Sequence, residues 1–250
     1  MTAVLKSKQA IGPGSTLYIS ECKEIASAAR PGQFLEVRTA KGHHPAMRKP
    51  LSVFCVEGDT FGMLVKTVGY GAEFMINRKP GDIFDIIGPL GQGFRYSEKD
   101  DNFILAAGGI GLAPLNFLAR ELTKKGKKVY LLFSPKRDAA LTDAITERSG
   151  LDIAYTENRH TVADDLKKMI ERVKDPCGVF TCGPNSFMKL VSETASLYGL
   201  KTQASLETRM SCGMGVCLGC VVPIRAEGDF IYKTVCRDGP VFDAGEVIFE

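Results

Sequence analysis

Four cysteines near the end of the chain have the types and spacing needed to bind iron. Cys212, Cys217 and Cys220 form a C-x4-C-x2-C pattern, and Cys236 follows after fifteen further residues. Four thiolates can hold a two-iron cluster, and this spacing is that of plant-type ferredoxins. Three glycines in the same segment let the backbone turn closely and bring N–H groups to the sulfurs. The segment therefore predicts a 2Fe–2S cluster.

Zinc is the alternative metal for these thiols. Structural zinc sites made of cysteine usually contain two C-x2-C units, whereas this segment has one, at Cys217 and Cys220. The four-residue gap before Cys217, with its glycines, favours iron. Cys22, Cys55 and Cys177 are isolated along the chain, and we expect ordinary buried thiols there.

Two glycine-containing turns could bind a nucleotide. The apolar run 103–107 ends in the sequence GGIGLAP at 108–114 and leads into a helical pattern. Glycine at such a corner lets the backbone approach a phosphate, whose charge the helix N-terminus favours. The sequence TCGP at 181–184 closes a later strand in the same way. The two turns together favour a nucleotide, although such glycines, and a buried cysteine at 182, also occur without one.

A further candidate site lies in the first hundred residues. Arg48 or Lys49, with Ser52 at the start of an expected strand, offers a cation and a hydroxyl that can hold a pyrophosphate. The sequence GYGAEF at 69–74 leads into an expected short helix and is a second candidate phosphate cradle. A solvated cation and a locally bonded serine are the alternative interpretation.

The elements that must position these residues change in character near residue 100. Before it, strands are expected at 16–21, 33–38, 51–56, 61–68 and 82–87. Short strands at this spacing predict a small antiparallel barrel. After it, strands expected at 103–107, 129–133, 153–155 and 179–182 alternate with helical patterns. This alternation predicts a doubly wound parallel sheet.

The boundaries follow from these patterns. We expect a barrel domain over residues 1–98, an α/β domain over 99–205 and a small lobe over 206–250, where cysteine and glycine are frequent. The fold class is thus multi-domain, β plus α/β.

Composition excludes several classes of protein. The 250 residues are 44% hydrophobic and 24% charged, with a net charge of +3. No concentrated basic block is present, so we expect no nucleic-acid partner. The N-terminus lacks the apolar core of a signal peptide, and the longest apolar run, 103–115, is too short to cross a membrane. We therefore expect a cytoplasmic protein with reduced thiols and no membrane partner.

Taken in order, these motifs resemble those of ferredoxin-reductase-like flavoproteins. The shared features are the Arg/Lys-x-x-Ser strand, the G-x-G turn, Gly88-Pro-Leu-Gly-Gln-Gly-Phe94, the GGIGxxP turn and the CGP turn. With the four cysteines and the sequence VCRDGPVF at 235–242, the chain closely resembles the electron-transfer subunit of type B dihydroorotate dehydrogenase. The resemblance covers nearly the whole chain.

That resemblance implies three cofactors and a partner. FAD is expected in the barrel domain, NAD on the α/β domain and the 2Fe–2S cluster in the lobe, facing an FMN-containing dehydrogenase catalytic subunit. The partner, expected in a heterotetramer, oxidises dihydroorotate to orotate, and electrons pass through the cluster and FAD to NAD+. Because the flavin carries the hydride chemistry, no catalytic side chain is expected in this chain.

The resemblance also assigns site residues. FAD contacts fall on Arg48, Lys49, Pro50, Leu51, Ser52, Leu64, Val65, Lys66, Gly71 and Ala72. NAD contacts fall on Gly109, Gly111, Cys182, Gly183 and Pro184. The cluster ligands are Cys212, Cys217, Cys220 and Cys236.

The chain departs from the family pattern at three places. Lys49 stands where arginine is usual, which replaces a bidentate phosphate contact by a point charge that Arg48 could supplement. Ala72 stands where threonine is usual and lacks its hydroxyl. The connection 156–161 is shorter than usual. The electron acceptor therefore has three alternatives: NAD, NADP or another molecule.

Other functions remain open at this point. The small subunits of ferredoxin:NADP transhydrogenases share the layout but have aspartate at the first cluster position, where this chain has Cys212. A stand-alone NAD(P)H reductase, a subunit serving another dehydrogenase, and a zinc-stabilised interaction module are the further alternatives.

Overall fold

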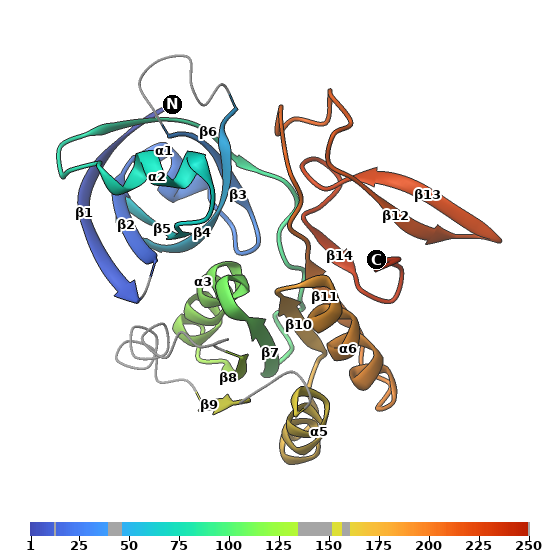
Figure 1. The fold of residues 1–250 in the computed structure, drawn as a ribbon. Helices are drawn as coiled ribbons and strands as arrows, with labels where there is room; N and C mark the ends of the chain where they lie inside the picture. Colours follow the sequence, from blue (N-terminus) through green and yellow to red (C-terminus); the bar gives the residue numbers. More distant parts are fainter. Residues whose placement is uncertain (13, 40–46, 135–151, 157–160, 250) are drawn as a thin grey trace.

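In the computed structural model, the described residues are 1–12, 14–39, 47–134, 152–156 and 161–249. They form a barrel, a sheet flanked by helices, and a lobe that carries a two-stranded hairpin (Figure 1). The connection 157–160, part of the predicted shortened loop, lies outside the described residues.

The first structural unit is a closed antiparallel barrel with strand order β1-β2-β5-β4-β3-β6. Its elements are β1 (Thr2–Gly12), β2 (Ser15–Glu21), α1 (Lys23–Ala28), β3 (Phe34–Arg38), β4 (Lys49–Glu57), β5 (Thr60–Lys66), α2 (Tyr70–Ile76) and β6 (Ile83–Leu90). The predicted barrel is therefore confirmed. Strand β1 was not predicted, because most of its residues are exposed and its sequence does not alternate regularly between apolar and polar.

The second unit is a sheet with strand order β14-β11-β10-β7-β8-β9. Its elements are β7 (Asn102–Gly108), η1 (Gly109–Gly111), α3 (Leu112–Lys124), β8 (Lys128–Ser134), β9 (Asp152–Tyr155), α5 (Val162–Arg172), β10 (Val179–Cys182), α6 (Asn185–Ser196) and β11 (Thr202–Ser205). The chain starts in the middle of this sheet, builds one half and crosses over to build the other. This order is that of a doubly wound fold, as predicted.

Side chains on the central strand β7 show why helices cover both faces. Phe103 and Leu105 pack with the apolar face of α3, whereas Ile104 and Ala106 pack with residues of α5 and α6. Neighbouring residues in a strand point to opposite faces. A continuous apolar run therefore requires cover on both sides of the sheet.

The lobe is joined to the sheet. It contains β12 (Val221–Ala226), β13 (Asp229–Thr234) and β14 (Val241–Asp243). Strand β14 pairs antiparallel with β11, with Phe242 opposite Ala204, and so adds a sixth strand to the parallel sheet. The predicted boundary between 205 and 206 remains a prediction, and this strand pairing crosses it.

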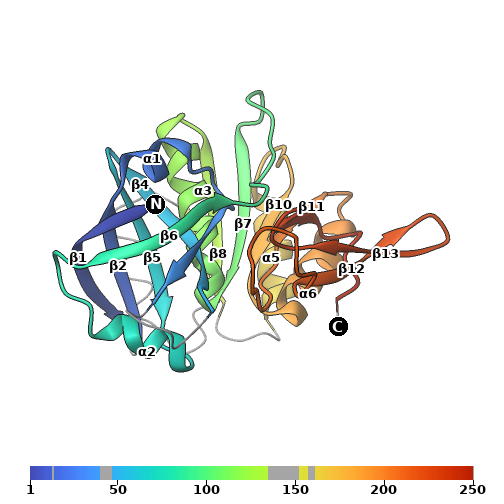
Figure 2. The ribbon, with the colours of Figure 1, turned by 90° about the horizontal axis from the view of Figure 1, so that it is seen from above.

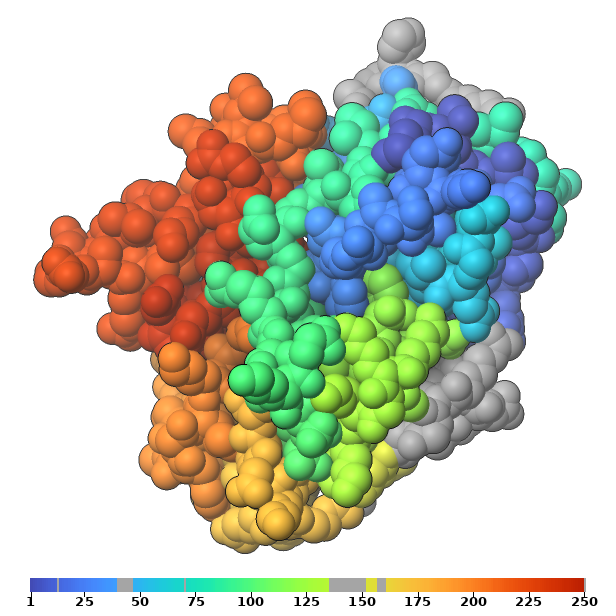
Figure 3. All heavy atoms as spheres, turned by 180° about the vertical axis from the view of Figure 1, so that it is seen from behind, coloured from blue at the N-terminus to red at the C-terminus, as the bar shows by residue number. Residues whose placement is uncertain are grey.

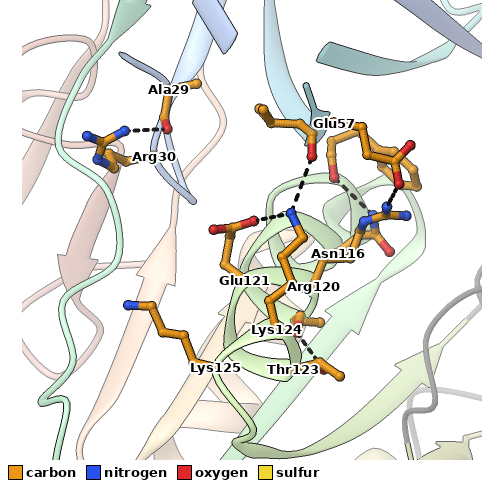
Figure 4. A network of polar contacts seen from close by, with 12 residues as sticks. Ala29, Arg30, Glu57, Asn116, Arg120, Glu121, Thr123, Lys124 and Lys125 are labelled. Atoms are coloured by element: carbon orange, nitrogen blue, oxygen red, sulfur yellow. Dashed lines mark hydrogen bonds and ion pairs between the residues drawn. The ribbon is translucent and has the colours of Figure 1, made fainter. Parts of the chain in front are cut away.

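Helix α3 connects the sheet to the barrel (Figure 4). The Asn116 side-chain N–H donates to the carbonyl of Phe54 in β4 at 2.9 Å, and Arg120 pairs with Glu57 at the end of the same strand. Phe117 packs in the barrel core. These contacts hold α3 against the barrel, and Ala113 in its first turn lines the cavity described below.

Candidate redox site between barrel, sheet and cysteine loop

A cavity of about 630 Å³ lies where the barrel, the start of α3 and the segment after β11 meet. Pockets of this size, mainly apolar with a few polar groups, are typical of cofactor sites. Its lining residues are Phe34, Met47, Arg48, Lys49, Pro50, Leu51, Ser52, Leu64, Lys66, Val68, Gly71, Ile110, Ala113, Ser205, Leu206, Glu207, Thr208, Arg209, Met210 and Pro240.

Eight of the ten predicted FAD residues line this cavity. All of 48–52 do so, because β4 begins at this end of the barrel. Val65 and Ala72 are not among the lining residues, since both side chains are buried in the barrel core. The structure therefore brings most of the predicted set together around one space, and the role of Val65 and Ala72 stays a prediction.

Arg48 already has a partner. Its guanidinium donates to the backbone carbonyl of Asp85 and to Asp85 Oδ2, each at 2.7 Å. This hydrogen bond lowers the pKa of the Asp85 carboxyl. Arg48 is thus held against the barrel wall, and Lys49 remains the closer counterpart of the usual arginine.

The segment 205–210 was missed as part of this cavity. It follows β11, and the carboxyl ends of parallel strands are where doubly wound sheets bind ligands, so the strand order could have indicated it. Desolvation raises the pKa of the Glu207 carboxyl, because the neutral form needs less water than the charged one. The nearby ammonium of Lys49 opposes that rise. Thr208 Oγ1 is buried and has no hydrogen-bond partner within the described residues.

These residues fit a flavin nucleotide. Among the described residues, the lining holds four cationic side chains and one carboxylate, and most of its other side chains are apolar. Cations suit the pyrophosphate, and the apolar walls suit the ring systems. The unpaired Thr208 hydroxyl is a hydrogen-bonding group left for a bound molecule.

The two predicted NAD turns meet at the ends of adjacent strands. Ala107 of β7 lies opposite Cys182 of β10. A Cβ added at Gly111 would lie 2.3 Å from the carbonyl oxygen of Cys182, and one at Gly183 would lie 3.0 Å from Gly108 Cα. Close contact between the turns therefore requires these glycines, whatever ligand they bind.

The remaining residues of the two turns differ in exposure. Gly109 has φ +54° and open space where a side chain would be. Cys182 is completely buried, and burial raises the pKa of its thiol. Ile110, between the two glycines of the first turn, lines the flavin-sized cavity. The first turn thus adjoins that cavity, and the binding role of the predicted NAD residues stays a prediction.

The cysteine loop directs backbone N–H groups at its own sulfurs. Those of Met214 and Cys217 donate to Cys212 Sγ at 3.4 and 3.5 Å. That of Gly215 donates to Cys236 Sγ at 3.0 Å. The backbone N–H of Cys236 donates to Cys220 Sγ at 3.4 Å. Hydrogen bonds of this kind stabilise thiolates and help to set the potential of a cluster.

These contacts link the four thiols in two pairs. Cys212 lies beside Cys217, and Cys236 lies beside Cys220. Hydrogen bonds from the Met214 N–H and other donors lower the pKa of Cys212 to about 6, while burial raises that of Cys236 to about 12. No three His, Cys, Asp or Glu residues in the described ranges gather around one metal-sized point. The paired donor set fits a cluster in which each iron takes two thiolates.

The cavity and the cysteine loop share a wall. Glu36 of β3 lies opposite Pro50, which lines the cavity, and a Cβ added at Gly213 would lie 2.6 Å from Glu36 Cγ. On the other side, the segment 205–210 lines the cavity and continues directly to Cys212. A flavin in the cavity and a cluster in the loop would therefore be close neighbours, as electron transfer requires.

Known proteins share both the fold and the cysteine lobe. Residues 207–248 match the family described as the iron–sulfur cluster binding domain of dihydroorotate dehydrogenase B. A solved NADH-dependent reduced ferredoxin–NADP oxidoreductase, studied for flavin-based electron bifurcation, is 27% identical with a TM-score of 0.84, over 99% of this chain and 90% of that chain. Phthalate dioxygenase reductase shares the fold, at 20% identity and a TM-score of 0.64, over 95% of this chain and 77% of that one.

Two curated relatives match along almost their full length. The Desulforamulus reducens protein is 33% identical over 96% of this chain and 95% of its own, and the Caldanaerobacter subterraneus subsp. tengcongensis protein is 36% identical over 88% and 87%. Both are named dihydroorotate dehydrogenase B (NAD(+)), electron transfer subunit.

Fold and site together define an iron–sulfur flavoprotein of the ferredoxin-reductase-like class, an oxidoreductase whose cofactors are FAD, an iron–sulfur cluster and NAD. Within that class, the chain belongs to the family of dihydroorotate dehydrogenase B electron-transfer subunits. This confirms the resemblance found in the motifs. No helix among the described residues is long and apolar enough to span a membrane.

Proposed function

We propose that this chain carries electrons from a partner dihydroorotate dehydrogenase, through its cluster and FAD, to NAD+. One observation carries the proposal: the short stretch from Ser205 to Cys212 lines the flavin-sized cavity at one end and enters the cysteine loop at the other. Two redox centres held by one stretch of backbone need no large movement to exchange electrons.

The residues of the chain have binding and positioning tasks. Bound FAD supplies the exchange between single electrons and hydride. Lys49, Lys66 and Arg209 are positioned to offset the charge of its pyrophosphate, and Ser52 and Thr208 offer hydroxyls. The 108–111 turn beside the cavity is positioned to bring a nicotinamide towards the flavin. The cysteine loop holds the cluster at the opposite side.

An apolar rim on the cysteine loop supports a protein as the electron donor. We call Met214, Val216 and Leu218 the collar; their exposed fractions are 53%, 79% and 61%. Leu218 also has φ +54°, one of two described residues other than glycine with positive φ. Strain of this kind is concentrated at functional sites. A collar that a partner covers would shield the cluster from water, which a small soluble acceptor would not do.

We further propose that the complex is a heterotetramer with an FMN-containing catalytic subunit and that it is cytoplasmic. The family resemblance supports the composition. A reducing compartment suits a chain whose described cysteines are all free and whose cluster ligands must be thiolates. Native mass spectrometry of the co-purified complex would give its stoichiometry.

The function is tested by purifying the chain with the dehydrogenase subunit and measuring dihydroorotate-dependent NAD+ reduction. We expect activity from the complex and none from this chain alone. Cys217→Ser should abolish it with loss of the cluster absorption, whereas Cys177→Ser, remote from the loop, should not. A chain that needs no partner, or a partner indifferent to dihydroorotate, would contradict the proposal.

A further inference from the structure

The hairpin of β12 and β13 is the part of the lobe that the rest of the protein supports least. Its strands pair from Val221 with Thr234 to Ala226 with Asp229, and it projects from the body of the molecule (Figures 2 and 3). Of its strand residues only Ile224 and Thr234 are buried. Two-stranded hairpins are marginally stable alone. Residues 246–248 pair with β12, where the Arg225 N–H donates to the Glu246 carbonyl, while among the described residues β13 pairs with β12 alone.

One face of the hairpin carries two exposed aromatic side chains next to the exposed Arg225. Pro223 lies opposite Tyr232 and Arg225 opposite Phe230, and directly opposite residues share a face. The rings of Phe230 and Tyr232 pack edge to face with centroids 5.4 Å apart, yet 44% and 65% of these residues remain exposed. On the other face Ile224 is buried in the core, whereas Ile231, directly opposite it, is 49% exposed. The face with the two rings therefore carries the larger share of exposed aromatic surface.

We call Val221, Pro223, Phe230 and Tyr232 the aromatic strip. Its base adjoins the cysteine loop, because Val221 follows Cys220 directly. Six of the sixteen exposed large apolar side chains in the described residues belong to the collar or the strip. Collar and strip thus form one apolar region that starts at the cluster and runs out along the hairpin. Contiguous exposed patches of this kind mark interaction sites.

We propose that the aromatic strip docks on the same dehydrogenase subunit that covers the collar. This rests on the proposed function, which requires a partner at the collar so that electrons can reach the cluster. A partner seated there meets the base of the hairpin, and the strip continues from that contact. The complementary surface is an apolar groove with an acceptor for the Tyr232 hydroxyl, since tyrosine at interfaces combines a buried ring with a hydrogen bond.

The two parts have different tasks in this arrangement. The collar surrounds the cluster and governs how electrons cross between the subunits. The strip lies farther along the hairpin and contributes affinity. Changes in the strip should therefore weaken association while leaving electron transfer within an assembled complex intact.

The test compares the dissociation constants of purified holo-chain variants for the purified dehydrogenase. Phe230→Ser combined with Tyr232→Ser should raise the constant at least tenfold, and turnover should return to the wild-type value at saturating partner. Tyr232→Phe should have a smaller effect. Leu197→Ser, an exposed apolar residue at the end of α6, is the matched control and should bind normally. Flavin and cluster spectra, and NADH oxidation by an artificial acceptor, report that each variant is folded.

The outcomes separate this inference from the function beneath it. If the wild-type chain does not bind the dehydrogenase, the proposed function fails. If it binds and the double variant binds equally well, the strip is not a docking surface and the function stands. A double variant that loses only self-association would make the strip a contact between copies of this chain, which also overturns the inference.

A photo-crosslinking residue at position 232 gives an answer even if the double variant does not fold. It should crosslink to the dehydrogenase. Crosslinks only to a second copy of this chain, or none in an active complex, would contradict the inference.

Discussion

Gly111→Ala isolates the contact between the two predicted NAD turns. Glycine at 111 has φ −59°, which alanine adopts without strain, so the substitution adds only one methyl group. That methyl would lie 2.3 Å from the Cys182 carbonyl oxygen and 2.6 Å from the Gly183 nitrogen. Both are backbone atoms, and β10 is paired on both sides, with β7 and with β11. No side-chain rotation can relieve the contact, so the turns must separate.

The magnitude follows from the distance. Ordinary contact begins near 3.4 Å, so the facing turn must retreat by about 1 Å. Overpacking of this kind costs about 1–3 kcal/mol. At about 2–4 °C for each kcal/mol in a chain of this size, the melting temperature should fall by about 2–12 °C. A displacement near 1 Å can lower a reaction rate by about 100-fold, so NADH oxidation should fall at least tenfold.

The assay combines thermal unfolding with steady-state NADH oxidation by an artificial acceptor, on the holo-chain. Cluster absorption should be unchanged, because the cysteine loop is not part of the contact. Gly126→Ala is the control: Gly126 has φ +74° but nothing within 4 Å, so it should lose some stability and keep its NADH kinetics. A Gly111→Ala protein with wild-type melting temperature and kinetics would refute the idea that packing between the turns shapes this site.

Three further predictions follow from the same geometry. Burial raises the pKa of Glu36 from 4.5 to about 7, so the folded state holds this proton more tightly than the unfolded state does. The stability of the fold should therefore fall by on the order of 3 kcal/mol as pH rises through this range. Glu36→Gln should flatten that fall in melting experiments at pH 5 to 8, and an unchanged profile would contradict the prediction. Gly213→Ala should push the loop off Glu36 and lower the iron content of the purified protein, whereas Gly228→Ala at the hairpin tip, with open space around it, should not. Cys212→Ser should abolish the cluster's electron paramagnetic resonance signal in the reduced protein while FAD remains bound; loss of FAD with the cluster would mean that the two sites do not fold separately.

Local sequence was sufficient to predict a site wherever a single segment of the chain supplies most of its residues. The C-x4-C-x2-C spacing predicts the cysteine loop because all the turning and most of the ligands lie within ten residues. The start of β4 was predicted as a candidate pyrophosphate-binding segment from residues 48–52 alone, and it lines the cavity. Alternating and continuous apolar runs predict the barrel and the doubly wound sheet, because burial on one or two faces leaves that pattern directly in the residues.

Tertiary structure decided what depends on segments distant in sequence. The segment 205–210 lines the cavity because β11 places its carboxyl end beside the barrel, and Val65 does not line it because its side chain points into the barrel core. Strand β14 joins the parallel sheet through pairing with β11, which its own three residues do not indicate. The chain's sequence thus determined its cluster, its fold class and its family, while the shared wall between flavin cavity and cysteine loop, and the uncovered face of the hairpin, depended on packing between units far apart in the chain.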